Sequence, residues 1–408
     1  MNNTLLFLCA FSSTLCVVKD TTVTFTKTYS VADGRRTRDA SFSDGRETQA
    51  ASVGDLDGDG TDEILVAGVK TGKDCELDCS LLFLSKTKTT KPFPTSYSVS
   101  VVRLSTEIQI VILGAQSSKK DDPDKTVKIY RILSRTEFPG ELISPEDRLQ
   151  LWQELNTGPS ATFKRIGDLE IIGIANQSLQ PVPGSNPDEG REYNVAIWKY
   201  TGSTSEDSKP FAPLHWLNTT GPNSDRVARW VDFQVLGEGH EIRAIVVGSS
   251  QVATKVGFFR FDSNMKLLSD RFHLLSDEPL YANLIRVEAC TVMIATKYGV
   301  RIYEYNPARD KYELHYEDST ETKDIWCKMI NRKTIFFMVR QEKQRIDVFE
   351  HYDDKNGELV IKKIQKSLDV PSKPLYATIE RFVVNQRGSV SLVLTHDLGA
   401  EVYQITVE

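Results

Sequence analysis

The stretch IRAIVVGSSQVATKVGFF, residues 242–259, contains the two patterns that decide the fold. IRAIVVG is a run of apolar, mostly branched residues that ends at a glycine, and such a run is typical of a strand covered on both faces. VGFF consists of an apolar residue, any residue, an apolar residue and an aromatic residue. This alternation places one set of side chains on the buried face of a second strand. Two neighbouring strands are therefore predicted here.

Both patterns occur seven times along the chain. The shorter one ends, at a mean spacing of about 53 residues, at Phe83, Tyr130, Trp198, Phe259, Tyr303, Phe349 and Tyr403. An apolar run precedes each copy, and a tight turn with a further strand follows. Regular modules of this length with about four strands each are typical of a β-propeller. We therefore predict an all-β fold, a single seven-bladed β-propeller of four-stranded blades. A ring of six or eight blades and a pair of β-sandwich domains are the alternatives.

The two ends of the chain are predicted to build one blade together. The last module stops at Glu408 after its third strand, and residues 21–31 (TTVTFTKTYSV) alternate like a strand but belong to no module. Pairing the two ends closes the ring and removes an exposed sheet edge. The predicted propeller therefore covers residues 19–408.

Residues 1–18, MNNTLLFLCAFSSTLCVV, are predicted to be a signal peptide. Their apolar run from Leu5 to Val18 is too short to span a bilayer and has the length of a signal-peptide core. A buried N-terminal strand is the alternative. We expect a protein that is secreted or in the secretory pathway, without a membrane span. In that compartment the sequons at Asn176 and Asn218 are candidate glycosylation sites.

Four cysteines remain after the predicted signal peptide. An even number in an oxidising compartment favours disulfides, and the spacing of Cys75 and Cys79 predicts a bridge across one short loop. A metal site with two thiols is the alternative for this pair. Cys290 and Cys327 lie in apolar contexts, and the sequence leaves open whether they pair or remain free in the core.

Composition excludes several classes of protein. The 408 residues are 40% hydrophobic and carry a formal net charge of −6. An apolar content of this size excludes intrinsic disorder, and the acidic balance disfavours a nucleic-acid partner. The sequence contains no G-x-S-x-G, H-E-x-x-H or phosphate-binding glycine motif. No catalytic residue is therefore nominated, and we expect a protein without enzymatic activity.

One acidic loop is a candidate metal-binding site. In VGDLDGDGTDEILVAG, residues 53–68, acidic residues alternate before a glycine that allows a sharp turn. Carboxylates gathered in one short loop repel each other unless a hard cation neutralises them, and Ca²⁺ prefers oxygen ligands of this kind. A solvated acidic turn is the alternative. The candidate ligands of one structural Ca²⁺ are the side chains of Asp55, Asp57, Asp59 and Glu63 and the carbonyl group of Thr61.

The same loop carries a resemblance to a known family. GDLDGDGTDEILVAG, residues 54–68, resembles an FG-GAP repeat of the integrin α-subunit N-terminal β-propeller and its secreted relatives. The resemblance covers one blade, and other modules keep fragments such as RIGDLEIIG from Arg165. It implies a propeller with Ca²⁺ in this loop. It also implies that loops between first and second strands lie on a lower face, and loops between second and third strands on an upper face where relatives bind ligands.

The upper-face loops are long in the first three modules, at residues 69–79, 116–126 and 177–192, and short in the last three. Long ordered loops in a compact fold are often functional, although a tolerated surface insertion is the alternative. We predict a calcium-stabilised protein-binding or adhesion module that contacts an extracellular or cell-surface protein through these loops. A carbohydrate-binding lectin is the first alternative. A secreted enzyme acting on polysaccharide or lipid is the second.

Overall fold

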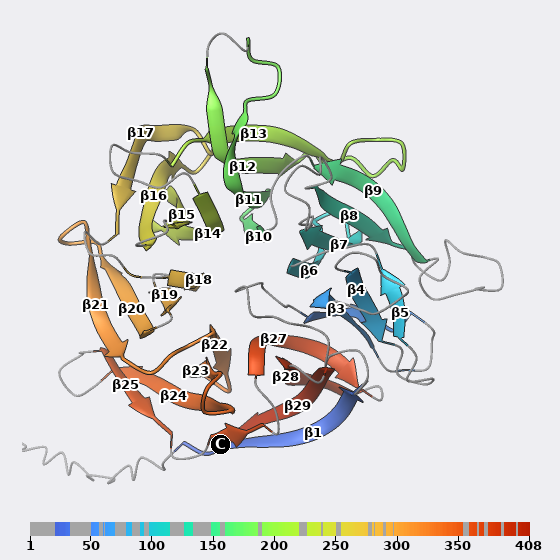
Figure 1. Cartoon of the computed structure of the whole chain (residues 1–408), viewed down its shortest axis with the longest axis vertical. Helices are drawn as coiled ribbons and strands as arrows, with labels where there is room; N and C mark the ends of the chain where they lie inside the picture. Colours follow the sequence, from blue (N-terminus) through green and yellow to red (C-terminus); the bar gives the residue numbers. More distant parts are fainter. Residues whose placement is uncertain are drawn as a thin grey trace, which may run out of the picture.

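The apolar runs form the second strand of each sheet in the computed structural model, and the patterns that end in an aromatic residue form the third. The structure describes residues 21–32, 50–56, 60, 62–69, 79–83, 90–93, 98–114, 126–133, 148–155, 160–186, 190–219, 227–237, 240–249, 254–275, 280, 282–288, 291–296, 298–353, 359–364, 367–370, 374–384, 387–396 and 399–408. These residues form seven antiparallel sheets arranged as a ring (Figure 1). The prediction of an all-β propeller is confirmed.

The first three blades follow one another along the chain. Blade 1 contains β2 (Ala50–Gly54), β3 (Glu63–Val69), β4 (Cys79–Phe83) and β5 (Thr90–Phe93). Blade 2 contains β6 (Ser98–Arg103), β7 (Gln109–Gly114), β8 (Val127–Ile132) and β9 (Leu149–Leu155). Blade 3 contains β10 (Ser160–Ile166), β11 (Leu169–Pro181), β12 (Glu192–Tyr200) and β13 (Phe211–Leu217).

The next three blades repeat this order. Blade 4 contains β14 (Val227–Leu236), β15 (Glu241–Ser249), β16 (Thr254–Asp262) and β17 (Leu267–Leu274). Blade 5 contains β18 (Ala282–Glu288), β19 (Thr291–Thr296), β20 (Gly299–Asn306) and β21 (Lys311–Asp318). Blade 6 contains β22 (Asp324–Ile330), β23 (Lys333–Arg340), β24 (Arg345–Asp353) and β25 (Leu359–Lys363), and the short β26 (Leu368–Asp369) also pairs with β24.

Blade 7 joins the two ends of the chain, as the sequence predicts. It contains β27 (Pro374–Val384), β28 (Arg387–His396), β29 (Gly399–Val407) and, as its outer strand, β1 (Val23–Ala32). Val23 pairs with Val407 and is completely buried. The Phe25 ring meets the Phe337 and Tyr403 rings edge-on at 6.2 and 6.5 Å. The first strands of neighbouring blades contact each other around the whole ring, including β2 with β27.

The core lies between adjacent sheets, where the repeated aromatic residues are placed. Most of the aromatic residues that end the third-strand pattern are buried. Among the described side chains, the following are at most 6% exposed: Tyr130, Phe259, Tyr303, Phe349 and Tyr403. Apolar second strands such as β15 and β23 are buried along most of their length. Burial on both faces explains why these runs are continuous in the sequence rather than alternating.

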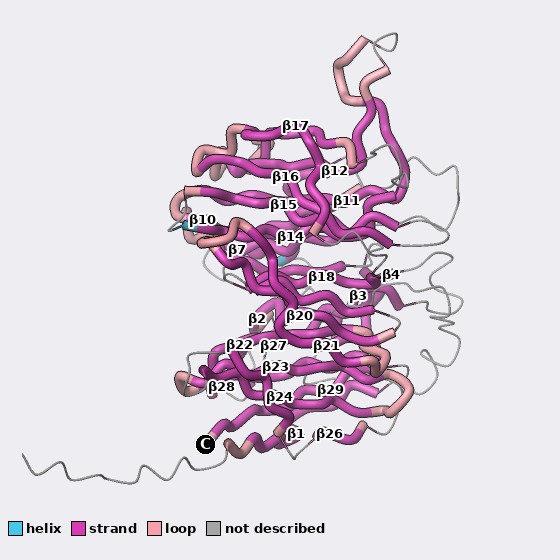
Figure 2. Tube along the Cα trace, turned by 90° about the vertical axis from the view of Figure 1, so that its left-hand side faces the viewer, coloured by secondary structure: helices cyan, strands magenta, loops and turns pink. Residues whose placement is uncertain are grey.

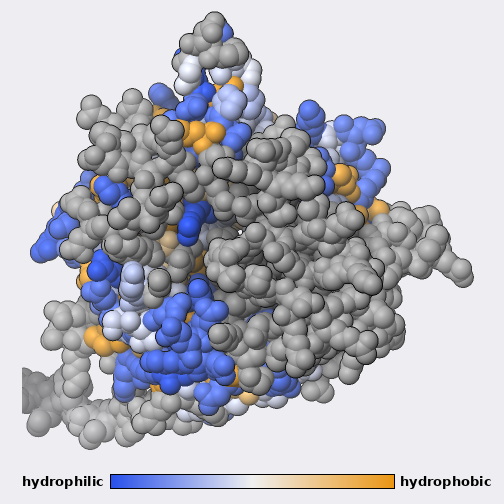
Figure 3. All heavy atoms as spheres, in the orientation of Figure 1, coloured by the Kyte–Doolittle hydropathy of each residue, from blue (hydrophilic) through white to orange (hydrophobic). Residues whose placement is uncertain are grey.

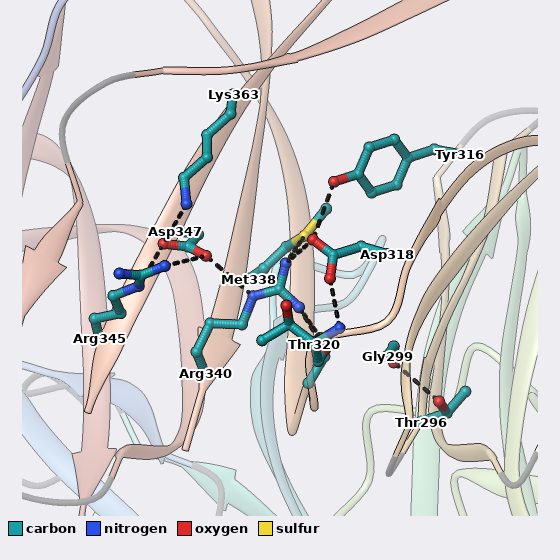
Figure 4. A network of polar contacts seen from close by, with 11 residues as sticks. Thr296, Gly299, Tyr316, Asp318, Thr320, Met338, Arg340, Arg345, Asp347 and Lys363 are labelled. Carbon is teal, nitrogen blue, oxygen red and sulfur yellow. Dashed lines mark hydrogen bonds and ion pairs between the residues drawn. The ribbon is translucent and has the colours of Figure 1, made fainter. Parts of the chain in front are cut away.

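A buried arginine joins blades 5 and 6 (Figure 4). Arg340 at the end of β23 is 0% exposed, and its guanidinium donates to Asp318 Oδ2 at 2.8 Å and to Asp347 Oδ2 at 3.2 Å. Asp318 ends blade 5, whereas Asp347 lies in β24 of blade 6. Arg340 Nη1 also donates to the carbonyl oxygen of Thr320 in the connection between the two blades, at 2.7 Å. Because the Arg340 charge is removed from water, these carboxylates are needed to compensate it.

Candidate functional site

The acidic loop of blade 1 is held together at both ends by its own carboxylates. Asp55 follows β2 directly, and its Oδ2 accepts a hydrogen bond from the Gly60 N–H at 3.0 Å. Glu63 begins β3, is completely buried, and accepts a hydrogen bond from the Leu56 N–H. Two of the predicted ligands, Asp55 and Glu63, are therefore parts of one compact turn. Asp57, Asp59 and Thr61 lie outside the described residues.

An arginine from the next blade also binds this loop. Arg148, directly before β9 of blade 2, is 7% exposed and donates from Nη1 to the carbonyl oxygens of Asp55 and Leu56, both at 3.0 Å. Its Nε donates to the carbonyl oxygen of Leu133 at 2.8 Å. The guanidinium therefore fixes the loop and offsets part of its negative potential. The sequence analysis missed this residue, because nothing in its local sequence separates it from a solvated arginine.

The chemistry of the donor set in this loop fits a calcium ion. Carboxylate and carbonyl oxygens are the ligands that Ca²⁺ takes in proteins. A completely buried carboxylate such as that of Glu63 needs donors or a cation nearby, and the Leu56 N–H supplies one donor. Within the described ranges, which omit three of the five candidate ligands, no group of three or more acidic, histidine or cysteine side chains is placed to hold a metal. Calcium binding stays a prediction.

Calcium removal provides the test of this loop. We expect EGTA to lower the melting temperature of the protein, and Asp57→Ala to lower it equally in the presence of Ca²⁺. A ligand at 100 times its dissociation constant stabilises the folded state by about 2.7 kcal/mol, and this contribution is lost when the ion is removed. The measurement is a thermal melt in Ca²⁺, in Mg²⁺ and in EGTA.

The matched control for Asp57→Ala is Asp168→Ala. Asp168 is exposed in the corresponding turn of blade 3, between β10 and β11, where a single aspartate remains. The control should keep both its melting temperature and its response to EGTA. If the wild-type protein melts at the same temperature in Ca²⁺ and in EGTA, the prediction of a structural calcium ion is wrong.

The structure bears differently on the predicted disulfide and on the two predicted glycosylation sites. Cys79 begins β4, whereas Cys75 lies outside the described residues, so the bridge between them stays a prediction. Asn218 is exposed after β13, as a glycosylated asparagine must be. Asn176 lies within β11 and is 3% exposed. Burial of this amide disfavours a glycan at Asn176 in the folded protein.

Cys327 is a free, buried thiol in β22. Burial, with a smaller contribution from the charge of Glu288, raises the pKa of the Cys327 thiol to about 12. The thiol is therefore protonated and unreactive at neutral pH, as expected for a core residue. Cys290 lies outside the described residues, so its pairing stays open.

A long hairpin, formed by β11 and β12, projects from blade 3. β11 and β12 remain paired as far as Pro181 and Glu192, and Figure 2 shows the hairpin at the upper right, extending beyond the rest of the ring. At its tip, the Val182 N–H donates to the Arg191 carbonyl oxygen at 3.0 Å, and the Ser185 N–H donates to the Val182 carbonyl oxygen at 3.1 Å. The described residues of the tip are exposed or half-buried. The described part of the hairpin is therefore hydrogen-bonded and accessible.

The later blades present short turns on the same face, as the sequence predicts. The second and third strands of blade 6 are joined by residues 341–344 and those of blade 5 by residues 297–298, against residues 182–191 in blade 3. Figure 3 shows hydrophilic residues gathered over β22–β25 of blade 6. The upper face is therefore asymmetric, with its described projection on blade 3.

Comparisons with known proteins support the fold and nothing beyond it. No family model and no curated protein matches the chain. A chain of the Saccharomyces cerevisiae core factor aligns over 95% of this chain at 10% identity, with a TM-score of 0.50, and this chain spans 60% of its length. Kluyveromyces lactis Hsv2 aligns over 75% of this chain and 83% of its own at 11% identity, with a TM-score of 0.42. Similarity at 10% identity, as with the core factor, shows the fold alone.

The described part of the chain was also searched for membrane-spanning helices. It contains no helix that is long and apolar enough to cross a bilayer.

Proposed function

We propose that the protein is a secreted or cell-surface-associated β-propeller that binds another protein through its upper face and has no enzymatic activity. Ca²⁺ in the acidic loop of blade 1 stabilises the ring in this proposal. The resemblance of that loop to an FG-GAP repeat and the apolar segment of residues 1–18 support calcium binding and secretion.

The observation that carries the proposal is the hairpin formed by β11 and β12. A closed ring of sheets is a stiff support, and binding residues are commonly placed on loops that such a support positions. Main-chain hydrogen bonds join the described residues Val182, Ser185 and Arg191 of the tip, which limits the conformational entropy that these residues lose when a partner binds. The tip also extends beyond the rim of the ring, where a partner can reach it.

The test replaces the hairpin tip without disturbing the blade. Residues 182–191 are exchanged for Asn-Gly, the sequence that favours a two-residue turn between paired strands. The Asn-Gly turn then connects Pro181 to Glu192, which are already paired. Wild-type and exchanged proteins are then used, as immobilised baits in Ca²⁺, to capture partners from extracellular medium and from cell surfaces, with identification by mass spectrometry.

Blade 3 also supplies a control of equal length on the opposite face. Residues 201–210 connect β12 to β13, and Tyr200 pairs with Phe211, so the same Asn-Gly exchange fits there. We expect one partner to be lost with the exchange at 182–191 and kept with the exchange at 201–210, while both variants keep the wild-type melting transition. Retention of every partner by the first variant would contradict the proposed binding face.

A further inference from the structure

Leu56 connects the acidic loop of blade 1 to the neighbouring blade. It lies between Asp55 and Asp57, two of the predicted calcium ligands, and its N–H donates to the carboxylate of Glu63, a third predicted ligand. Its carbonyl oxygen accepts a hydrogen bond from Arg148 Nη1 of blade 2 at 3.0 Å. Leu56 is also 1% exposed. Both the main chain and the side chain of this residue are therefore held by their surroundings.

The side chain of Leu56 belongs to the core between blades 1 and 2. The same apolar cluster contains Val53 and Leu65 of blade 1 together with Ile132 and Leu149 of blade 2. Ile132 ends β8, Leu149 begins β9, and these two residues pair. Close-packed interiors transmit small displacements, so a shift of Leu56 changes the packing between the two blades.

Arg148 makes a second connection to the same part of blade 2. Its Nε donates to the Leu133 carbonyl oxygen at 2.8 Å, and the Leu133 N–H donates to the Arg148 carbonyl oxygen at 2.8 Å. These bonds continue the pairing of β8 with β9 beyond the ends of the two strands. The guanidinium that binds the carbonyl oxygens of Asp55 and Leu56 is therefore anchored to the end of β8.

The turn that contains Leu56 is long compared with the corresponding turns of other blades. Residues 55–62 join β2 to β3, whereas residues 167–168 join β10 to β11 and residues 331–332 join β22 to β23. A two-residue turn is closed by the pairing of its own strands. In the long turn, repulsion between carboxylates opposes the bonded arrangement around Leu56. Binding of a cation by these carboxylates therefore favours the arrangement, and release of the cation disfavours it.

We propose that Leu56 and Arg148 couple calcium binding in the acidic loop to the junction of blades 1 and 2. This inference rests on the calcium site of the proposed function. In the calcium-bound protein, the carbonyl oxygens of Asp55 and Leu56 hold Arg148, and Arg148 and Leu56 together hold the adjoining ends of β8 and β9. After calcium release, repulsion in the loop displaces Leu56 and weakens its bond to Arg148. The dependence on calcium is therefore local to one junction of the ring.

Hydrogen–deuterium exchange of the full chain in Ca²⁺ and in EGTA tests the coupling, after calorimetry with Ca²⁺ has measured binding of the ion. Exchange is followed over times short compared with global unfolding. We expect faster exchange in EGTA within residues 127–133 and 148–155 of blade 2, although no predicted calcium ligand lies there. Residues 333–340 and 345–353 of blade 6 should exchange equally in both solutions.

The outcomes separate the coupling from the calcium site itself. Binding of Ca²⁺ with unchanged exchange in blade 2 would overturn the coupling alone. Equally faster exchange of every blade in EGTA would also overturn it, because the effect would not be local to one junction. Absence of Ca²⁺ binding to the wild-type protein would contradict the calcium site and the coupling together.

Arg148→Lys separates the position of the guanidinium from its charge. Lysine keeps the positive charge but lacks the planar fork that binds Asp55, Leu56 and Leu133 together. Coupling between two sites is reciprocal, so this variant should bind Ca²⁺ about 10- to 100-fold more weakly, the usual effect of losing a residue that orients metal ligands. It should also lose most of the rise in melting temperature that Ca²⁺ gives the wild type. An arginine with a merely structural role would leave the calcium dissociation constant unchanged when replaced.

The matched control is Arg131→Lys in β8 of the same blade. Arg131 Nη1 donates to the Thr204 carbonyl oxygen at 3.5 Å, toward blade 3 rather than blade 1. The control should keep the calcium dissociation constant of the wild type. Unchanged calcium affinity in Arg148→Lys, or equal weakening in both variants, would overturn the role of Arg148. If Arg148→Lys fails to fold, the exchange experiment on the wild-type protein still decides whether the junction responds to calcium.

Discussion

Val23→Asp is expected to lower the free energy of unfolding by about 3–5 kcal/mol, the usual cost of an uncompensated buried charge. Val23 is 0% exposed and lies in the cluster formed by apolar residues of β1, β23, β24, β28 and β29. A carboxylate there would either remain charged in an apolar site or release β1 from β29. Either result opens the ring and exposes the edge of blade 7.

The control lies one residue further along the same strand. Thr24 pairs with Thr406 on the other face of β1 and is exposed, so Thr24→Asp should change the free energy of unfolding by less than about 1 kcal/mol. Urea denaturation followed by circular dichroism compares both variants with the wild type. Similar denaturation midpoints for Val23→Asp and Thr24→Asp would show that β1 does not close the ring.

Arg340→Met is expected to have the second large effect, a loss of about 3–5 kcal/mol of unfolding free energy. The methionine fills part of the arginine volume but leaves Asp318 and Asp347 without their shared cation. Arg345→Met is the control, because Arg345 also binds Asp347, at 2.8 Å, but its side chain is 29% exposed. Asp347 keeps its bonds to Arg340 and Lys363 in this control, and the lost pair is partly open to water, so the control should lose much less unfolding free energy than Arg340→Met does.

The effect of Arg340→Met should also depend on pH. Burial raises the pKa of Asp318, but the hydrogen bond from Thr320 and the charge of Arg340 outweigh it, so the pKa lies below the ordinary value of 3.8. A carboxyl group whose pKa is lowered by folding stabilises the folded state at pH values above its ordinary pKa. This contribution is lost as the pH falls through the pKa of the folded state. The difference between wild type and Arg340→Met should therefore be full at neutral pH and smaller in acid. A difference that grows in acid would contradict the role of Asp318.

The architecture could be predicted because it depends on local patterns. Each blade repeats an apolar second strand and a third strand ending in an aromatic residue, and these patterns are visible within about 20 residues of sequence. Ring closure followed from counting strands at the two ends. The short upper-face turns of the later blades were also predicted, since their length is read directly from the spacing of the strands.

The contacts between blades could not be predicted in the same way. Arg148 binds Leu56 across 92 residues, and Arg286 meets Trp230 and Trp326 in the centre of the ring. These residues are far apart in sequence, and their contact depends on the order and twist of the blades. A charged residue within an apolar strand, as in LIRVE around Arg286, was the available signal for a buried polar site. It does not reveal which residue is its partner.

Hydrogen–deuterium exchange of the complex with a captured partner tests the central claim most directly. The claim is that the ring supports a partner-binding upper face with the β11–β12 hairpin as its contact. Amide exchange is compared for the free and the bound chain in Ca²⁺. The account predicts slower exchange on binding within residues 182–191 and unchanged exchange within residues 201–210 of the same blade. Slower exchange confined to residues 201–210 would place the partner on the lower face and contradict the account.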